Sequence, residues 1–435
     1  MRSARWFRSF SVAAFASLSA LAAFVSPRSA HAQLPAPEPL SIGKVKGWEL
    51  TLDGRLSTFI SFSQGDPQPP TTALWQGYQD KPDSSNHIVA TRIRSGFVSN
   101  VLGWTVRKEV APGTAISGRL AIWGNVSQQR DKTVTPDVDF REAYWKIEGP
   151  WGAVLAGRNL GVYGRGGINL DYDIEHGYGL GSPCMIVNRE PGHGPIAACG
   201  HVGFGILFPA FNAQLTYNTP ELAGFQFTVG LFDPASVGER SYERTPLPRV
   251  ESELSFKAAK YFHAEISAMW QRIGNNDTSL NLNVDALGFA YSAGLNLGPV
   301  QVGGAGFLGQ GLGIWAAMEN YPVFSDDKFV LRHQKGFLGM AAVNFGHTKI
   351  AAGVGETLVG RTSNDPSTPF TSLNFPRSQL GISAGVYQAV LEDVVLGIDY
   401  FRATTTWNDA YDMNMAVFTP KQTVNFVNVG GTLVF

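Results

Sequence analysis

The chain ends in TVNFVNVGGTLVF, residues 423–435, and this stretch decides the fold class. Side chains of a β-strand point alternately to its two faces, so the stretch divides into two sets of residues. One set is wholly apolar and consists of Val427, Val429, Leu433 and Phe435. The other set mixes apolar with polar residues, namely Phe426, Asn428, Thr432 and Val434. The C-terminus therefore predicts a strand in a sheet with one apolar face.

The N-terminus predicts export from the cytoplasm. A basic segment, residues 2–8, precedes an uncharged apolar run, residues 10–25, and the small-x-small sequence AHA at residues 30–32. These are the parts of a secretory signal peptide, which we predict for residues 1–32. A retained membrane helix is the alternative, but the apolar run is shorter than the ~20 residues that a span needs.

The composition is poor in charge. Only 16% of the residues are charged, against roughly 25% in ordinary soluble proteins. Beyond the signal peptide, no uninterrupted apolar stretch approaches the ~18 residues of a membrane helix. Residues 1–32 carry four Arg and no acid, so their removal takes the formal net charge from −1 to −5. A mildly acidic mature chain argues against a nucleic-acid binder, which would show a clustered basic footprint, so nucleic acid is excluded as a partner. A sheet that faces lipid on one side and water on the other explains both features, because apolar and polar residues then alternate.

Such alternation recurs, and the breaks between the alternating segments are short and long in turn. It is clear in residues 211–218, 249–258, 262–271 and 393–401. The short breaks lie at residues 111–113, 150–152, 221–224, 260–261, 298–299, 346–347 and 391–392. The long ones, rich in Pro and Gly, lie near residues 65–87, 130–138, 160–202, 233–248, 274–283, 310–335, 361–374 and 405–420. A soluble β-sandwich would account for a few such strands, but here there are many more.

Seven short and eight long connections join sixteen strands. We therefore predict an all-β fold, a transmembrane antiparallel β-barrel over residues 48–435, with short periplasmic turns and long extracellular loops. The barrel must close, because an open sheet edge in hydrocarbon would leave backbone groups unpaired. The Pro-rich residues 33–47 are interpreted as a periplasmic lead-in.

Residues 140–164, FREAYWKIEGPWGAVLAGRNLGVYG, resemble the trimeric general porins of Gram-negative outer membranes. That family pairs a strand of the form R-x-A-[YF]-x-x-[IL], matched here from Arg141, with a strand that ends in G-R-N, matched by residues 157–159. The family's R-x-G-F motif resembles TRIRSGF, residues 91–97, in which Arg94 is the closest match. The family also ends on a phenylalanine that the barrel-assembly machinery reads, and Phe435 matches it.

The resemblance implies that the third long loop, residues 160–202, folds into the barrel and narrows the lumen. Acidic residues of this loop face an arginine cluster on the wall in that family. By resemblance, the constriction is expected to contain Asp171, Asp173, Glu175, Arg92, Arg94 and Arg141, with Arg158 nearby. The family's Pro-Glu-Phe-Gly-like loop motif is absent here, so a solvated loop surface is the alternative position for the acids. The length of the loop independently indicates that it occupies interior space.

The chain has two cysteines, Cys184 and Cys199, both in this same loop. In an exported protein such a pair indicates a disulfide, which in the entropy model constrains the unfolded chain by about 3 kcal/mol. Two free thiols are one alternative. A metal site with His193 or His201 is another, but no Cys-x-x-Cys spacing supports it.

Two motifs suggest enzymes, but their surroundings do not. Ser383 is the centre of a G-x-S-x-G sequence, which exposes a nucleophile only at a strand-to-helix turn. Here it lies within an alternating strand and is expected to point into the lumen. Residues 304–309 fit G-x-G-x-x-G, but no amphipathic helix follows them. We therefore predict no catalysis, no cofactor and no metal site.

These observations predict an outer-membrane porin, by resemblance a homotrimer, that passes small hydrophilic solutes and ions by diffusion. The mildly acidic mature chain slightly favours cations. The expected partners are outer-membrane lipid, lipopolysaccharide and the barrel-assembly machinery. A solute-specific porin for sugars or anions, with Trp123 in a binding track, is the alternative, and a barrel-based outer-membrane enzyme or adhesin is a third.

Overall fold

The computed structural model describes residues 39–67, 69, 72, 83–96, 100–124, 138–175, 200–235, 243–275, 283–314, 317–318, 323–326, 328–365, 369–370, 374–412 and 414–435. The predicted signal peptide lies outside these residues and stays a prediction. Among the described residues, no helix combines the length and the hydrophobicity that crossing a membrane requires.

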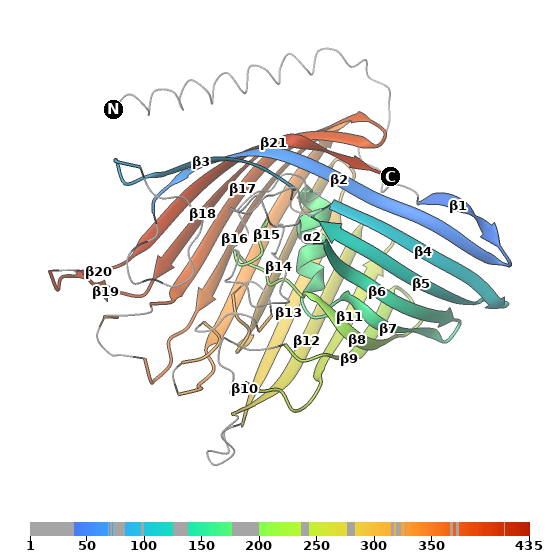
Figure 1. The fold of residues 1–435 in the computed structure, drawn as a ribbon, viewed down its shortest axis with the longest axis horizontal. Coiled ribbons are helices and arrows are strands. Elements are labelled where there is room, and N and C mark those ends of the chain that lie inside the picture. Colours follow the sequence, from blue (N-terminus) through green and yellow to red (C-terminus); the bar gives the residue numbers. More distant parts are fainter. Residues whose placement is uncertain are drawn as a thin grey trace.

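One antiparallel sheet closes on itself to form a barrel (Figure 1). In chain order its strands are β2 (Trp48–Gly65), β3 (Ile88–Arg94), β4 (Asn100–Ala111), β5 (Thr114–Gly124), β6 (Val138–Gly149), β7 (Gly152–Leu160), β8 (Phe211–Asn218), β9 (Phe225–Phe232), β11 (Arg249–Ala258), β12 (Phe262–Asn275), β13 (Asn283–Asn296), β14 (Val300–Gln310), β15 (His333–Phe345), β16 (Thr348–Val359), β17 (Pro376–Leu391), β18 (Val394–Trp407) and β21 (Lys421–Val434). Strands β3 and β4 both pair with β2 and share one position in the ring, so the barrel has sixteen strands, as predicted. The other described elements are β1 (Leu40–Val45), β10 (Glu243–Arg244), β19 (Ala410–Tyr411), β20 (Val417–Phe418) and the helix α2 (Arg165–Glu175).

Strand β21 closes the ring, because it pairs with β18 on one side and with β2 on the other. The last residue takes part in this seam. The N–H of Gly54 donates to the carbonyl of Phe435 at 2.7 Å, and the N–H of Phe435 donates to the carbonyl of Gly54 at 3.0 Å. The seam therefore leaves no open edge between these strands, which is the condition for a sheet in hydrocarbon.

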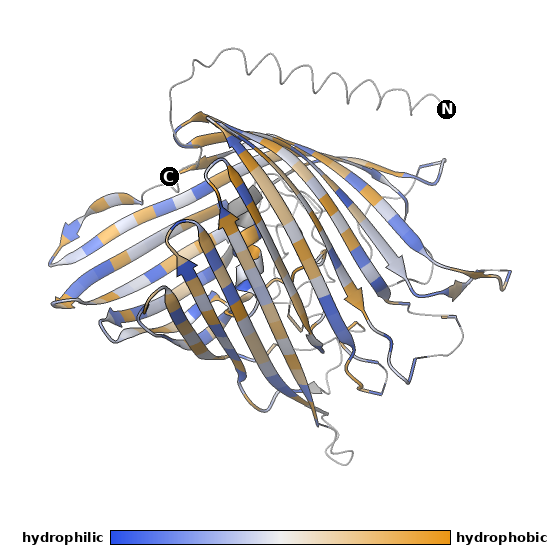
Figure 2. Ribbon diagram, turned by 180° about the vertical axis from the view of Figure 1, so that it is seen from behind, coloured by the Kyte–Doolittle hydropathy of each residue, from blue (hydrophilic) through white to orange (hydrophobic). Residues whose placement is uncertain are grey.

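The two faces of β21 differ as its sequence predicts. Val429 and Leu433 are 44% and 40% exposed on the outer face, whereas Phe426 and Asn428 are fully buried on the inner face. Apolar and polar positions also alternate along the neighbouring strands (Figure 2). The outer face is thus apolar and accessible, which is what contact with acyl chains requires.

Short turns join the strands at one end of the barrel, and long loops join them at the other; we call these the turn end and the loop end. All seven predicted short breaks fall at turns between paired strands, such as residues 112–113 between β4 and β5. The predicted long breaks fall between strands at the loop end. The connection lengths therefore gave the correct order and direction of the strands.

The segment before the barrel contains a strand that its prolines did not indicate. Within the predicted lead-in, residues 33–47, strand β1 pairs antiparallel with residues 48–52 of β2. A two-residue turn at Lys46 and Gly47, both with positive φ, joins the two strands, as is usual in tight hairpins. The sheet thus continues along the edge of β2 beyond the position of Phe435.

The inside of the barrel is partly filled, although alternation alone predicts a hydrated interior. Loops and inner-face side chains form buried apolar clusters. One cluster includes Leu170, Val202 and Ile206 of the third loop together with Leu338, Met340 and Tyr387 of the wall. A second includes Tyr163 and Leu207 of that loop together with Met269, Phe307 and Phe324. Part of the inner wall is therefore a hydrophobic core and not a water-lined surface.

Candidate pore and its constriction

The third loop, described over residues 161–175 and 200–210, folds into the barrel as expected. Its helix α2 contacts strands β12 to β16 and lies inside the ring of strands (Figure 1). Gly166 stands in the first turn of α2, and a Cβ atom there would overlap the side chains of Glu265 and Ser292. The missing side chain allows the helix to lie close to the wall.

Carboxylates of β11 hold the start of this loop. The Oε2 atom of Glu251 accepts hydrogen bonds from the N–H groups of Val162 (2.7 Å) and Tyr163 (2.8 Å). The Glu253 carboxylate accepts two hydrogen bonds from the guanidinium of Arg165, at 2.7 and 2.5 Å. Both glutamates are almost fully buried, with exposed fractions of 1% and 3%. Buried N–H groups that precede a helix need acceptors, and Glu251 supplies them.

Asp171, which was expected to face the arginines across the lumen, is instead fully buried on α2. Its Oδ2 atom accepts a hydrogen bond from the N–H of His201 at 3.1 Å. The Nε2 atom of His201 lies 2.8 Å from the Oγ atom of Ser383 on β17. Burial raises the pKa of Asp171 to about 7 and lowers the pKa of His201 to about 4, so the imidazole is neutral at neutral pH.

Ser383 points into the barrel, as expected, and its contact with His201 does not form a catalytic triad. The Asp171 carboxylate binds the backbone of His201, whereas a triad requires it to orient the ring. The exposed fractions of Ser383, His201 and Asp171 are 2%, 0% and 0%, so no substrate can reach the hydroxyl. The contact fastens the returning part of the third loop to the wall.

A charged cluster occupies the opposite wall, on β2, β5 and β6, and we call it the Arg119 cluster. The guanidinium of Arg119 binds Asp53 at 2.6 and 2.9 Å and Glu142 at 3.1 and 3.3 Å. It also donates to the hydroxyl of Thr105 at 3.1 Å, so all five of its N–H donors are used. Gly103 lies beneath it, and a Cβ atom there would be 2.6 Å from Nη2. The guanidinium therefore lies flat on the wall.

The predicted arginines of β3 lie on the inner face. Arg92 is opposite Ser61, which is fully buried on the inner face of β2, and the Arg92 side chain is exposed. Arg94 is opposite Phe59 on the same face. The side chain of Arg94 lies outside the described residues, so only its position on the strand is known.

Arg141 occupies a bulge in β6, where the register with β5 shifts. Its guanidinium lies 5.2 Å from the ring centre of Trp123 and 5.8 Å from that of Phe211. The two rings are 5.1 Å apart. The Nε1 atom of Trp123 donates to Glu142 at 3.4 Å, which joins this aromatic group to the Arg119 cluster.

Arg158 does not share a face of the sheet with the other predicted arginines. It lies opposite Ala143 and Ala213, which are both exposed on the outer face, so the register places Arg158 on the outer face as well. The side chains of Asp173 and Glu175, together with Cys184, Cys199 and His193, lie outside the described residues. Their predicted roles remain predictions.

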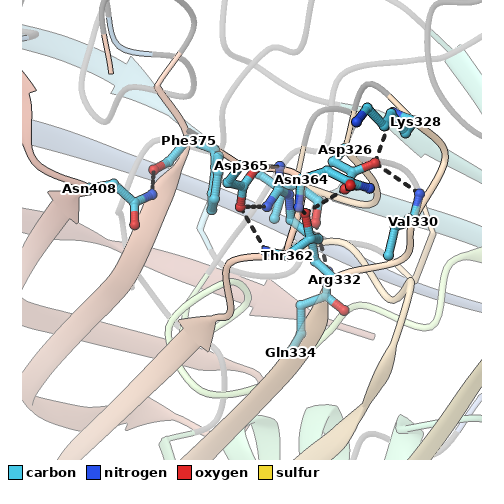
Figure 3. Close-up of polar contacts among 11 residues, drawn as sticks. Asp326, Lys328, Val330, Arg332, Gln334, Thr362, Asn364, Asp365, Phe375 and Asn408 are labelled. Atoms are coloured by element: carbon cyan, nitrogen blue, oxygen red, sulfur yellow. Dashed lines mark hydrogen bonds and ion pairs between the residues drawn. The ribbon is translucent and has the colours of Figure 1, made fainter. Parts of the chain in front are cut away.

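Polar contacts tie the long loops together at the loop end (Figure 3), and we call these contacts the loop-end network. Arg332 forms two hydrogen bonds with Asp365, at 2.5 and 2.8 Å, and its Cζ atom lies 3.7 Å from the ring centre of Phe375. Asp326 accepts two backbone N–H groups of its own loop, both at 2.9 Å, and the hydroxyl of Thr362 in the next loop. The network fixes these loops over part of the barrel mouth.

The sequence model of the Gram-negative porin family matches residues 16–420, which is almost the whole chain. The chain belongs to the Gram-negative porins. No curated protein matches it significantly. The family, together with the closed barrel, makes the chain an outer-membrane channel for passive diffusion.

Solved structures share the fold of this porin at low sequence identity. The outer membrane channel DcaP of Acinetobacter baumannii is 10% identical, with a TM-score of 0.61 over 90% of this chain and 99% of that chain. The anion-selective porin from Comamonas acidovorans is 15% identical, with a TM-score of 0.57 over 89% and 100%. Salmonella typhi OmpF, in a complex with daunomycin, is 13% identical, with a TM-score of 0.52 over 89% and 98%.

Sequence reasoning missed two groups of charged residues inside this porin. Glu251 and Glu253 were visible as polar residues of an alternating strand, but a water-lined lumen would show the same pattern. Arg119 gave no local signal, because its partners Asp53 and Glu142 are 66 and 23 positions away in the chain. A charged residue on an inner face, with opposite charges on the same face of nearby strands, would have been the signal to follow.

Proposed function

We propose that solutes cross this porin between the inner wall of β2 to β6 and the loop that carries α2. The distribution of burial supports this route. The loops and the inner faces of β12 to β18 and β21, together with Phe59 of β2, form closed apolar clusters. The wall of β2 to β6 instead keeps polar side chains accessible, such as the exposed Arg92 and Asp53, whose side chain is 27% exposed. Water and hydrophilic solutes need polar groups along their route.

We assign the wall side of the constriction to Arg92, Arg94, Arg141 and the Arg119 cluster. The loop side is assigned to Asp173 and Glu175. The burial of Asp171 and the outer-face register of Arg158 are reasons to leave these two residues out. Opposite charges on two sides of a narrow waist create a transverse field, which favours polar solutes and ions over bulky apolar ones.

The function that the geometry supports best is sieving of small hydrophilic solutes by size and polarity. The accessible polar wall opposite a buried apolar one is the observation that carries it. Planar-bilayer recording of the purified protein tests the proposal. We expect stepwise, ohmic conductance that rises with salt concentration, whereas a folded barrel that carries no current would contradict it.

A solute-specific porin is the second candidate, and the aromatic group around Arg141 is the observation that favours it. Aromatic faces bind the apolar faces of sugar rings, and a guanidinium binds anions. Saturable block of the current by one solute, weakened in Trp123→Ala, would support this candidate. Equal flux of sugars and anions of the same size would argue for simple sieving.

We also propose that a signal peptide exports the chain and that the barrel-assembly machinery recognises its last strand. The support for recognition of the last strand is the position of Phe435 in the closing seam. A homotrimer that contacts lipid and lipopolysaccharide rests on the family resemblance. On a denaturing gel, the unheated sample should migrate at trimer size, and an unheated band at monomer size would contradict the trimer.

A further inference from the structure

We propose that Glu251 and Glu253 of β11 are positioning residues that set the width of the passage by holding the start of the third loop against the far wall. The inference rests on the proposed passage between α2 and the wall of β2 to β6. In the proposed route these residues lie on the far side from the solutes, and they act through the loop that they hold.

The bonds that carry the inference fall on consecutive residues of the loop. Glu251 accepts the N–H groups of Val162 and Tyr163, and Glu253 binds the guanidinium of Arg165. The N–H of the intervening residue, Gly164, donates to the hydroxyl of Ser267 on β12 at 2.9 Å. Four consecutive residues are therefore fastened to the wall immediately at the start of α2.

The charges of this anchor are compensated away from water. The Nε atom of Arg249 lies 2.8 Å from the Oε1 atom of Glu251, and both side chains are 1% exposed. The Arg165 side chain is 26% exposed and that of Glu253 only 3%. Hydrogen bonds between ionised groups are stronger than neutral ones, and they gain further strength where water is excluded. An anchor of this kind holds one position and does not let the loop slide along the wall.

The anchor is separate from the bonds that make the barrel. Strand β11 pairs with β9 and β12 through backbone groups, so the ladder does not need either carboxylate. Both glutamates stand on the inner face, alternating with outward residues such as Leu254, which is 38% exposed. Removing the carboxylates should therefore release the loop while the wall stays closed. The released helix would move away from the wall or adopt several positions, and the passage would change with it.

The test is single-channel conductance together with a liposome-swelling series of neutral sugars of increasing size, measured on Glu251→Ala/Glu253→Ala. Conductance should change by about two-fold or more, with larger current fluctuations and an altered size limit, because the width of the waist governs passage. A heat-modifiable gel band should show that the double variant still forms a barrel. Glu253→Gln, which keeps the size of the side chain but removes its charge, should show a smaller change in the same direction.

Asp285→Ala is the matched control. Asp285 pairs with Arg272 of the neighbouring strand at 2.9 Å. It lies two positions from the exposed Leu287 and so on the same, outer face, and loss of the Asp285 carboxylate should therefore leave conductance and size limit unchanged. If the double variant does not fold, the Glu253→Gln measurement decides the matter. Wild-type current and size limit in a folded Glu253→Gln variant, or in the folded double variant, would overturn the inference. Absence of current in the wild-type protein would instead overturn the proposed function.

Discussion

Replacing Asp365 by asparagine tests how firmly the loop-end network holds the mouth of the barrel. The Asp365 carboxylate binds the Arg332 guanidinium through two hydrogen bonds, and the exposed fractions of the two side chains are 4% and 3%. Asparagine keeps the size of the side chain and one acceptor oxygen. It removes the negative charge, so the buried guanidinium, stacked on Phe375, would lose its ion pair with Asp365.

The expected effect is large and local. Removing one partner of a buried ion pair costs about 3–5 kcal/mol, which corresponds to a higher population of the opened loops by roughly 10² to 4 × 10³. The strands β15, β16 and β17 pair through backbone groups, so the barrel itself should not be weakened to that extent. The opening should therefore be confined to the loops that the network joins.

Hydrogen–deuterium exchange with mass spectrometry on the folded protein measures this opening directly. Peptides over residues 323–332 and 360–365 should exchange faster in Asp365→Asn by about the factor given above, while peptides from β15 to β17 should not change. Asp409→Asn is the control, because Asp409 and Arg377 are 3.9 Å apart and their side chains are 51% and 49% exposed. Exposed pairs contribute at most about 1 kcal/mol. Loop exchange in Asp365→Asn that equals that of the wild type or of Asp409→Asn would refute the reasoning.

Three further outcomes are expected. Arg119→Ala should shift the reversal potential in a salt gradient toward cations, because two lumen carboxylates lose their shared cation, whereas Arg158→Ala on the outer face should leave it unchanged. Burial raises the pKa of Asp326. Hydrogen bonds from a hydroxyl, two backbone N–H groups and an amide outweigh burial and hold this pKa below its ordinary value of 3.8. The Asp326 carboxylate therefore stabilises the loop-end network above pH 3.8, and this stabilisation is lost as the pH falls through the lower, folded-state pKa. Hydrogen exchange of these loops, corrected for the intrinsic rate, should be equal at pH 7 and pH 5 and should rise only below about pH 3.8. Mass spectrometry of non-reduced protein should show Cys184 linked to Cys199, and two alkylatable thiols would contradict the disulfide.

The barrel was predictable because its information is local. A period of two in hydrophobicity fixes which face of a strand meets lipid, and connection length fixes which end of the strand is which. Residues such as Val429 and Leu433 carry that information without reference to any other strand. Strand β1 escaped prediction because its hairpin signal, Lys46-Gly47, follows a Pro-rich segment, residues 35–39, that is typical of an extended lead-in.

The site was less predictable because its information is distributed over the chain. Asp171 lies on a helix, and the side of a helix that faces the lumen depends on what packs against the other side. Here Leu170 packs in an apolar cluster with the wall, and Asp171 is fully buried and contacts the returning segment at His201. The error in Arg158 was avoidable, since its position opposite Ala213 follows from counting along the alternating strand. The family motif suggested a role that the alternation of the strand does not support.

The apolar residues of the inner wall explain why the third loop enters the barrel at all. Phe401 and Phe426 are fully buried on the inner faces of β18 and β21, although both strands also carry apolar residues on their outer faces. In a water-filled lumen each of these rings would lose about 1.5–3 kcal/mol of burial energy. Phe204 of the third loop covers them, with its ring centre 5.4 Å from that of Phe401. Strands that are apolar on both faces therefore mark the covered wall, and strands such as β5, with Arg119 inside and Leu120 outside, mark the passage.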